Sequence, residues 1–307
     1  MKIKDLIIAG AGPAGLSAAI YGMRAGMDLV VVEKIAPGGQ VMTTYEVENY
    51  PGFAEPVPGW ELMSRMEAQA RRLGADIASG DIERFSWNAE EKCFVMNIAG
   101  GETLRARAVI AATGASLMKL GVPGEAEFTG RGVSYCATCD AAFFRDRVTA
   151  VVGGGNTALE EANYLTKFSS KVYLIHRRDK FRGEKMLQER VLANPKIEPV
   201  YHAVITAVIG EHKVESVGIS DCLTGESRAL PVDGVFIFVG YQPNTAWLPA
   251  DLLSKKGEVI VDMQMRTSLP GLFAAGDLRL DSIRQIVAAT ADGATAALSA
   301  YQYLEGL

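Results

Sequence analysis

The sequence predicts an α/β fold of two domains built on parallel sheets, with the second domain inserted into the first. Two stretches, residues 6–33 and 148–175, share one layout: a short β-branched run, a glycine-rich turn, a helix-like stretch and a second apolar run. Strands that alternate with helices in this way are typical of parallel sheets with right-handed crossovers. At 307 residues the chain also exceeds the usual size of one hydrophobic core, which favours two domains.

The other elements are predicted from apolar periodicity and from glycine and proline punctuation. Between the two repeats we expect a helix over residues 59–73 and strands over 93–98 and 109–112. The helix of the second repeat is expected to continue through Phe168. The remaining expected elements are a hairpin over residues 203–220, a buried strand over 234–239 and a long alanine-rich helix over 288–304.

Composition and charge indicate an ordinary globular protein. Apolar residues make up 49% and charged residues 22% of the chain, without a segment biased enough to predict disorder. The net charge of -5 argues against a nucleic-acid surface. No window holds the roughly 18 uninterrupted apolar residues that a membrane helix needs. The first residues resemble a secretory signal, but Asp5 and the glycines that follow suit a nucleotide turn better, so we expect a cytoplasmic protein.

The first glycine-rich turn has the spacing of a dinucleotide-binding fingerprint. Gly10 permits a tight bend, Gly12 lets the backbone approach a pyrophosphate, and Gly15 lets the helix pack closely on the strand. Glu33 ends the second strand, where a carboxylate can accept hydrogen bonds from ribose hydroxyls. Such a turn alone is a weak signal, but here strand, turn, helix, strand and acid occur in order. The residues predicted to bind this dinucleotide are Gly10, Gly12, Pro13, Ala14, Gly15 and Glu33.

The second glycine-rich turn indicates a dinucleotide of a different kind. Its third glycine is replaced by Ala158, and the strand after it ends in a cluster of up to five cations rather than in an acid. Guanidinium groups bind phosphate bidentately, so the cluster suits the 2′-phosphate of NADPH. The alternative is a solvated charged loop, against which the position of the cluster argues. The predicted NADPH-binding residues are Gly153, Gly155, Asn156, Thr157, Ala158, His176, Arg177, Arg178 and Arg182, with Lys180 nearby.

Two fingerprints predict two Rossmann-like domains, of the FAD- and NAD(P)-binding kind. An acid-type site followed by a phosphate-type site fits FAD held permanently and NADPH bound in turn. The turns at residues 113–114 and 240–243 interrupt the pattern, and we place the two crossings between domains there. The prediction is a discontinuous FAD-binding domain over residues 1–114 and 245–307, with an NADPH-binding domain over 115–244.

A pair of cysteines, Cys136 and Cys139, lies just before the second repeat. Zinc needs about four ligands, and the other two cysteines, Cys93 and Cys222, are isolated, which argues against a metal site. We interpret these two as small buried residues without a role. A C-x-x-C at the start of a helix can close a disulfide, and the helix N-terminus stabilises a thiolate, so redox exchange is favoured. Asp140 could move the proton that exchange requires; the alternative is a helix cap.

The order of these motifs resembles the bacterial-type, low-molecular-weight thioredoxin reductases, which belong to class II of the pyridine nucleotide-disulfide oxidoreductases. The resemblance covers essentially the whole chain. Further segments are similar to the flavin-contacting regions of the family, and it implies that Asp277 meets the ribityl or pyrophosphate portion and Gln285 the isoalloxazine ring. The FAD-binding residues that the resemblance adds are Gly39, Gln40, Asn49, Thr113, Gly114, Gly276, Asp277, Arg284, Gln285 and Ile286.

The resemblance implies an activity as well. NADPH would reduce FAD, FAD would reduce the Cys136/Cys139 disulfide, and the dithiol would reduce thioredoxin by exchange, with Cys139 facing the flavin. The family forms homodimers, and its inserted domain would rotate about hinges near residues 113–114 and 240–244. One departure is Ala141 and Ala142, which follow Asp140 where family members often carry glycine; this removes no reactive group.

Two other functions share most of these features. A relative with the same fold and cysteine pair could take electrons from ferredoxin or pass them to oxygen, although the basic cluster argues against it. A flavin-binding redox sensor would control a partner through its disulfide state without turnover. It would bind flavin but would not consume NADPH steadily with any disulfide protein.

Overall fold

The computed structural model describes residues 2–44 and 46–306. The chain forms two compact units, one made of Met1–Ser116 with Gln242–Leu307 and the other of Leu117–Tyr241. The second unit is thus an insertion in the first. The chain leaves the first unit after Ser116 and returns to it at Gln242. The expected boundaries were residues 114 and 245, so each differs from the observed one by two or three residues.

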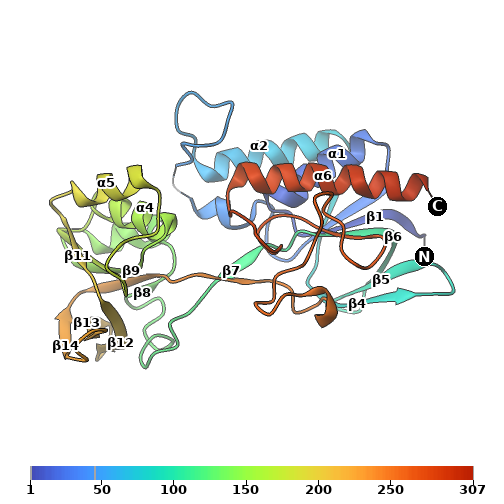
Figure 1. The fold of residues 1–307 in the computed structure, drawn as a ribbon. Coiled ribbons are helices and arrows are strands. Elements are labelled where there is room, and N and C mark those ends of the chain that lie inside the picture. Colours follow the sequence, from blue (N-terminus) through green and yellow to red (C-terminus); the bar gives the residue numbers. More distant parts are fainter. Residues whose placement is uncertain (1, 45, 307) are drawn as a thin grey trace. The chain divides into compact units, whose positions relative to one another are not determined.

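A seven-stranded sheet forms the centre of the first unit (Figure 1). The strand order is β3-β2-β1-β6-β5-β4, and β17 pairs with β6. The strands on one side of the sheet are parallel, whereas β4 and β5 pair antiparallel with each other and β5 with β6. The strands are β1 (Lys4–Ala9), β2 (Leu29–Glu33), β3 (Asp76–Ser79), β4 (Ile82–Asn88), β5 (Cys93–Ile98), β6 (Thr103–Ala111) and β17 (Leu272–Ala274).

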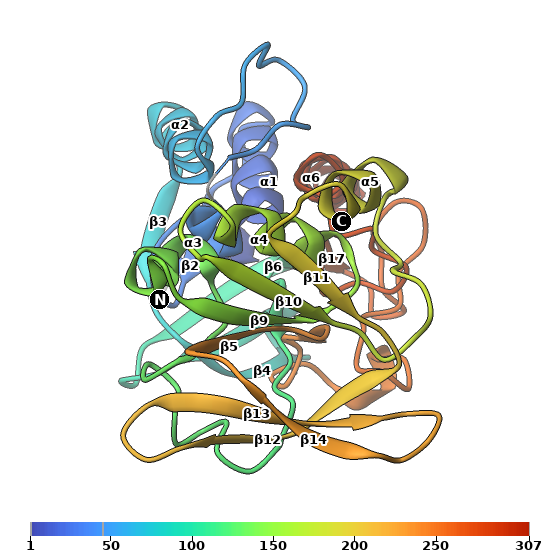
Figure 2. The ribbon, with the colours of Figure 1, turned by 90° about the vertical axis from the view of Figure 1, so that its left-hand side faces the viewer.

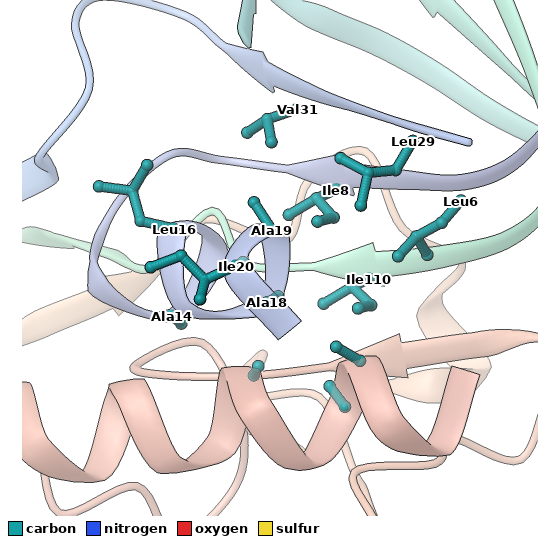
Figure 3. Packing of buried hydrophobic residues seen from close by; sticks show 14 of the residues in the cluster. Leu6, Ile8, Ala14, Leu16, Ala18, Ala19, Ile20, Leu29, Val31 and Ile110 are labelled. Carbon is teal, nitrogen blue, oxygen red and sulfur yellow. The ribbon is translucent and has the colours of Figure 1, made fainter. Parts of the chain in front are cut away.

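Three helices cover one face of this sheet: α1 (Pro13–Arg24), α2 (Gly59–Arg72) and α6 (Ile286–Glu305). Apolar side chains of β1 and β2 meet the inner face of α1, and Leu6, Ile8 and Leu16 are fully buried (Figure 3). Alanines line the contact between α1 and α6, so the two helices approach closely. The short strand-to-helix turn of the first fingerprint is therefore held between a rigid sheet and two packed helices.

Gly293 of α6 lies directly against the backbone of α1. A Cβ at this position would overlap the carbonyl oxygen of Ala14. We expect Gly293→Ala to lower the free energy of unfolding by about 1–2 kcal/mol, because overpacking exceeds the gain in helix propensity. Urea denaturation of the FAD-saturated protein measures this. Gly306→Ala is the matched control, because its Cβ would make only ordinary contacts at 3.6–3.7 Å; equal stability of the two variants would contradict the packing argument.

The second unit has three layers (Figure 2). Its parallel sheet has the order β11-β10-β9-β15-β8. Helices pack on one face of the sheet, and an antiparallel meander of β12, β13 and β14 packs on the other. The strands are β8 (Val133–Ser134), β9 (Val148–Gly153), β10 (Lys171–Ile175), β11 (Ile197–Val200), β12 (Ala203–Gly210), β13 (Val214–Asp221), β14 (Ser227–Pro231) and β15 (Gly234–Phe238); the helices are α3 (Ala137–Asp140), α4 (Asn156–Leu165) and α5 (Lys185–Leu192).

The two segments that join the units pair as a small sheet of β7 (Ala115–Leu117) and β16 (Tyr241–Pro243). Next to them, Gly114 and Gly240 have φ of 64° and 143°, the region that favours glycine. The sequence predictions of a Rossmann-like layout for each unit are confirmed. One element was predicted too long: α4 ends at Leu165, because residues 166–168 form a tighter turn in which the amide of Phe168 donates to Leu165.

Within the described residues, no helix combines the length and apolar character needed to cross a membrane.

Candidate redox and dinucleotide-binding sites

The first glycine-rich turn leaves β1 and enters α1 with little room around two of its glycines. Gly10 has φ of 103°, and a Cβ there would overlap the carbonyl group of Ala112; a Cβ on Gly15 would overlap the carbonyl oxygen of Gly10. A Cβ on Gly12, in contrast, would meet nothing within 4 Å. Pro13 occupies the first turn of α1, where its missing amide hydrogen is no loss. The free space at Gly12 beside a helix N-terminus fits a pyrophosphate.

Glu33 lies at the end of β2, next to this turn. Its Oε2 accepts a hydrogen bond of 2.8 Å from the amide of Ala11, and its Oε1 accepts one of 3.0 Å from the amide of Ile35. The carboxylate is therefore fixed in place by the backbone. Each of its oxygens has a further lone pair, which suits the ribose hydroxyls that the sequence predicts.

Segments that are far apart in the sequence meet at this turn. A Cβ on Gly39 would lie 3.3 Å from Cα of Gly12, and a Cβ on Gly276 would lie 3.0 Å from Cβ of Ala14. The Cα atom of Thr113 is 3.1 Å from a Cβ on Gly10. The structure thus brings three of the segments predicted from the resemblance to the turn of the first fingerprint.

The other predicted flavin residues of the first unit form a second group. Nδ2 of Asn49 donates a hydrogen bond of 3.0 Å to Oε1 of Gln285. This bond joins the segment between β2 and α2 to the residue that precedes α6. The side-chain amide of Gln40 donates to the carbonyl oxygen of Ala115. Arg284 has φ of 54° and forms an ion pair of 3.8 Å with Glu258. Ile286 is the first residue of α6, and Gly114 is half-buried beside Thr113.

Asp277 lies between Gly276 and Arg279, two residues that a buried carboxylate of α6 holds in place. Asp292 of α6 receives hydrogen bonds from the Arg279 guanidinium at 2.6 and 3.0 Å and from the amide of Gly276 at 3.1 Å. Burial raises the pKa of the Asp277 carboxyl, which accepts a bond of 3.4 Å from the Ser282 hydroxyl. A half-buried carboxyl with few protein partners suits a polar ligand such as the ribityl chain.

The second glycine-rich turn repeats this geometry between β9 and α4. A Cβ on Gly153 would overlap the carbonyl oxygen of Phe238, whereas one on Gly155 would meet nothing within 4 Å. Asn156 exchanges hydrogen bonds of 2.8 Å with both the backbone and the side chain of Glu184. The Thr157 hydroxyl lies 3.0 Å from that of Tyr241, and Ala158 is buried. This turn therefore also has free space at the glycine that faces a phosphate in the fingerprint.

The basic cluster lies beside the second turn. The amide of Arg182 donates a hydrogen bond of 2.6 Å to the carbonyl oxygen of Gly154, which holds the loop after β10 against the turn. Arg177, Arg178 and Arg182 are exposed, and none of them forms an ion pair with a carboxylate in the described part of the chain. Three guanidinium groups without a protein counter-ion favour an anionic ligand over the alternative of a merely solvated loop.

His176 differs from the rest of the cluster, because only 5% of the residue is exposed. Burial lowers the pKa of its imidazole, and the Arg182 guanidinium lowers it further, so the ring adds no charge to the cluster at neutral pH. The ring packs against the position that a Cβ on Gly154 would occupy. Its Nε2 has no hydrogen-bond partner among the described residues. The prediction of up to five cations therefore reduces to four.

The two cysteines are joined as a disulfide, Cys136–Cys139, with Cα atoms 5.4 Å apart. Cys136 caps α3, and the amide of Cys139 donates to its Sγ at 3.2 Å. Cys139 is exposed and Cys136 half-buried. The helix that follows has only four residues, so the nearby amide groups, rather than a long helix dipole, act on the sulfur.

Asp140 is the last residue of α3 and lies on the rim of a cavity in the second unit. Its side chain makes no capping hydrogen bond, so the helix-cap alternative is wrong. The cavity has a volume of about 310 Å³, and Phe143, Arg131 and Lys213 also line it. Asp140 is half-buried and follows Cys139 directly in the chain, and neither cysteine is among the described residues that line this cavity.

Sequence reasoning missed a second carboxyl at the disulfide. Oε2 of Glu161 in α4 accepts a hydrogen bond of 2.9 Å from the amide of Ala137, and the amide of Thr138 also donates to this side chain. Burial, with a smaller effect of the Glu160 charge, raises the pKa of Glu161 to about 7. A signal existed in the sequence: Glu161 falls on the apolar stripe of α4 formed by Ala158, Ala162 and Leu165.

The predictions for the other two cysteines differ in outcome. Cys93 is buried in β5, as predicted. Cys222 is exposed, so the prediction that it is buried is wrong. It lies in the polar turn between β13 and β14, where the amide of Leu223 donates a hydrogen bond to the Asp221 side chain.

Comparison with known proteins agrees with this arrangement. The model of the pyridine nucleotide-disulphide oxidoreductase family matches residues 4–293. The chain is 47% identical to the thioredoxin reductase of Listeria innocua, over 100% of this chain and 95% of that protein. The chain belongs to the thioredoxin reductase family. A relative from Bacillus subtilis with this name is 45% identical, over 100% of this chain and 96% of the relative.

A solved thioredoxin reductase from Lactococcus lactis has the same fold, with a TM-score of 0.96, 39% identity and coverage of 99% of this chain and 100% of that chain. As a member of this family the chain is a flavoprotein oxidoreductase with FAD and NADPH as cofactors. The open space at Gly12 and Gly155, both beside helix N-termini, fits the pyrophosphates of two such dinucleotides.

Proposed function

We propose that the protein is a thioredoxin reductase that carries two electrons from NADPH to the disulfide of thioredoxin through its own Cys136–Cys139 pair. The observation that carries this proposal is the disulfide itself, which lies in the unit that also holds the second dinucleotide turn and its basic cluster. The names of the relatives from Listeria innocua and Bacillus subtilis support thioredoxin as the substrate.

Residues of the first unit would hold FAD. The backbone at Gly10 to Gly15 would contact the pyrophosphate, Glu33 the ribose hydroxyls and Asp277 the ribityl chain. Thr113, Gly114, Gly276 and Gly39 would shape the site around the turn. Gln40, Asn49, Arg284, Gln285 and Ile286 would border the ring. When bound, FAD supplies a carrier that accepts hydride from NADPH and delivers two electrons to a disulfide.

In the second unit, Gly153 to Ala158 would contact the NADPH pyrophosphate, and Arg177, Arg178 and Arg182 would bind its 2′-phosphate. His176, neutral and buried, would support the turn. Two electrons and two protons convert Cys136–Cys139 to a dithiol. One thiolate then attacks the thioredoxin disulfide to form a mixed disulfide, and the other resolves it, which leaves thioredoxin reduced and the pair oxidised again. Asp140 would take and return a proton at the sulfurs.

Anaerobic mixing of the oxidised holoenzyme with three electron donors tests the proposal. NADPH is expected to bleach the flavin absorbance rapidly, NADH slowly, and reduced ferredoxin not at all. Rapid bleaching by ferredoxin and none by NADPH would instead support the ferredoxin-dependent alternative. A redox sensor would bleach once but would not consume NADPH steadily when thioredoxin is added.

The proposal includes a homodimer, as the resemblance implies, and the cytoplasmic location that we expect from the sequence. Light scattering of the purified holoenzyme after size-exclusion chromatography tests the homodimer, and the expected mass is twice the chain mass of 32.9 kDa. A monomeric mass at micromolar concentration would contradict it.

A further inference from the structure

The carboxyl group of Glu161 contacts the turn between the two cysteines, although it belongs to a different element. It accepts hydrogen bonds from the amides of Ala137, at 2.9 Å, and of Thr138. These are the two residues between Cys136 and Cys139. Of the amide groups in this turn, the one on Cys139 is directed to Sγ of Cys136, at 3.2 Å.

Amide groups at such a turn normally stabilise a thiolate. A dithiol whose thiolate is stabilised holds its electrons more tightly, which makes the corresponding disulfide a stronger oxidant. A reductase requires the opposite, namely a dithiol that gives up its electrons readily. Two of the amide groups donate to the Glu161 carboxylate and so are not available to a thiolate. The carboxylate also places a negative charge one hydrogen bond from the turn, and both effects oppose thiolate formation.

We infer that Glu161 is a positioning residue of the redox pair, which fixes the Cys136–Cys139 turn through two amide groups and keeps its dithiol strongly reducing. The inference rests on the proposed function, because that function is what would make a strongly reducing dithiol useful. It concerns an equilibrium property of the pair, however, which can be measured without NADPH or thioredoxin.

The burial of the site supports this inference. Ala137 is fully buried, and Glu161 lies in the layer where α3 packs on α4. Interactions of a charge are stronger in such surroundings than at the surface. Its pKa of about 7 means that the group is mostly ionised at pH 8. Its neighbour Glu160 is exposed on the same helix, so it provides a control of equal charge.

The test is the redox equilibrium of the pair in the FAD-containing protein at pH 8. Wild type and variants are equilibrated with mixtures of reduced and oxidised dithiothreitol, quenched with an alkylating reagent, and the peptide that carries both cysteines is quantified by mass spectrometry. We expect Glu161→Gln to shift the equilibrium about tenfold toward the dithiol, which is about 30 mV for a two-electron couple. Glu161→Asp, which keeps the charge, should stay closer to wild type, and Glu160→Gln should match wild type.

An equilibrium for Glu161→Gln within twofold of wild type would overturn the inference, as would an equal shift in Glu160→Gln. Glu161→Ala gives a second measurement because it removes both acceptors; if it does not fold, Glu161→Gln decides alone. A normal equilibrium in a protein that does not reduce thioredoxin would remove the proposed function but not the role of Glu161.

Discussion

Replacing Cys139 with serine is expected to abolish NADPH-dependent reduction of thioredoxin, to at most about 10⁻³ of the wild-type rate, because a serine hydroxyl supplies no thiolate for exchange. Cys136→Ser should have the same effect, because the two sulfurs act as one unit in the disulfide. FAD should remain bound, since the residues proposed to hold it lie in the other unit. The measurement is the rate of NADPH oxidation with thioredoxin, together with the flavin content of each variant.

Cys222→Ser is the matched control for these variants. Cys222 is an exposed free cysteine in the same unit, so its loss removes a thiol without affecting the disulfide. We expect its turnover to equal that of wild type. Thioredoxin reduction that persists in either Cys136→Ser or Cys139→Ser would show that the pair is not the electron path.

The double variant Arg177→Ala/Arg178→Ala is expected to raise the KM for NADPH by about 10²-fold, because two charge-assisted contacts to a phosphate would be lost. NADH lacks that phosphate, so its KM should change little. Steady-state kinetics with both donors measure the difference. The expected result is a protein that has lost most of its preference for NADPH while its kcat stays close to wild type.

Lys185→Ala controls for a general loss of positive charge near the cluster. Lys185 begins α5, a few residues after Arg182, and its side chain is 91% exposed, paired with Glu189 at 3.7 Å. Its KM for NADPH should be unchanged. Equal losses of affinity for NADH and NADPH in the double variant would mean that the arginines support the fold of the loop rather than bind a phosphate.

The repeated β-strand, turn and helix units could be predicted because local chemistry determines them. At Gly10, Gly15 and Gly153 a Cβ would overlap backbone atoms. The glycine spacing in the sequence therefore indicates where two backbone segments approach each other closely. The fully buried strand β15 is likewise visible as an uninterrupted apolar run. The strands β3 and β4 were not predicted, because most of their residues are half-buried or exposed and their apolar pattern is weak.

Features that depend on tertiary contacts escaped the sequence analysis. The charge state of His176 follows from its burial beneath Gly154, and the role inferred for Glu161 follows from the packing of α3 on α4. Neither is a property of neighbouring residues in the chain. Cys222 shows the converse error, since a small apolar residue was assumed to be buried although its turn lies at the surface.

The stoichiometry of anaerobic turnover tests the central claim most directly. Purified FAD-containing protein is mixed with a limiting amount of NADPH and an excess of oxidised thioredoxin, and the thiols that appear in thioredoxin are counted. We predict one thioredoxin dithiol, that is two thiols, for each NADPH oxidised. Oxidation of NADPH without thiols in thioredoxin would contradict the proposed path of electrons through Cys136 and Cys139.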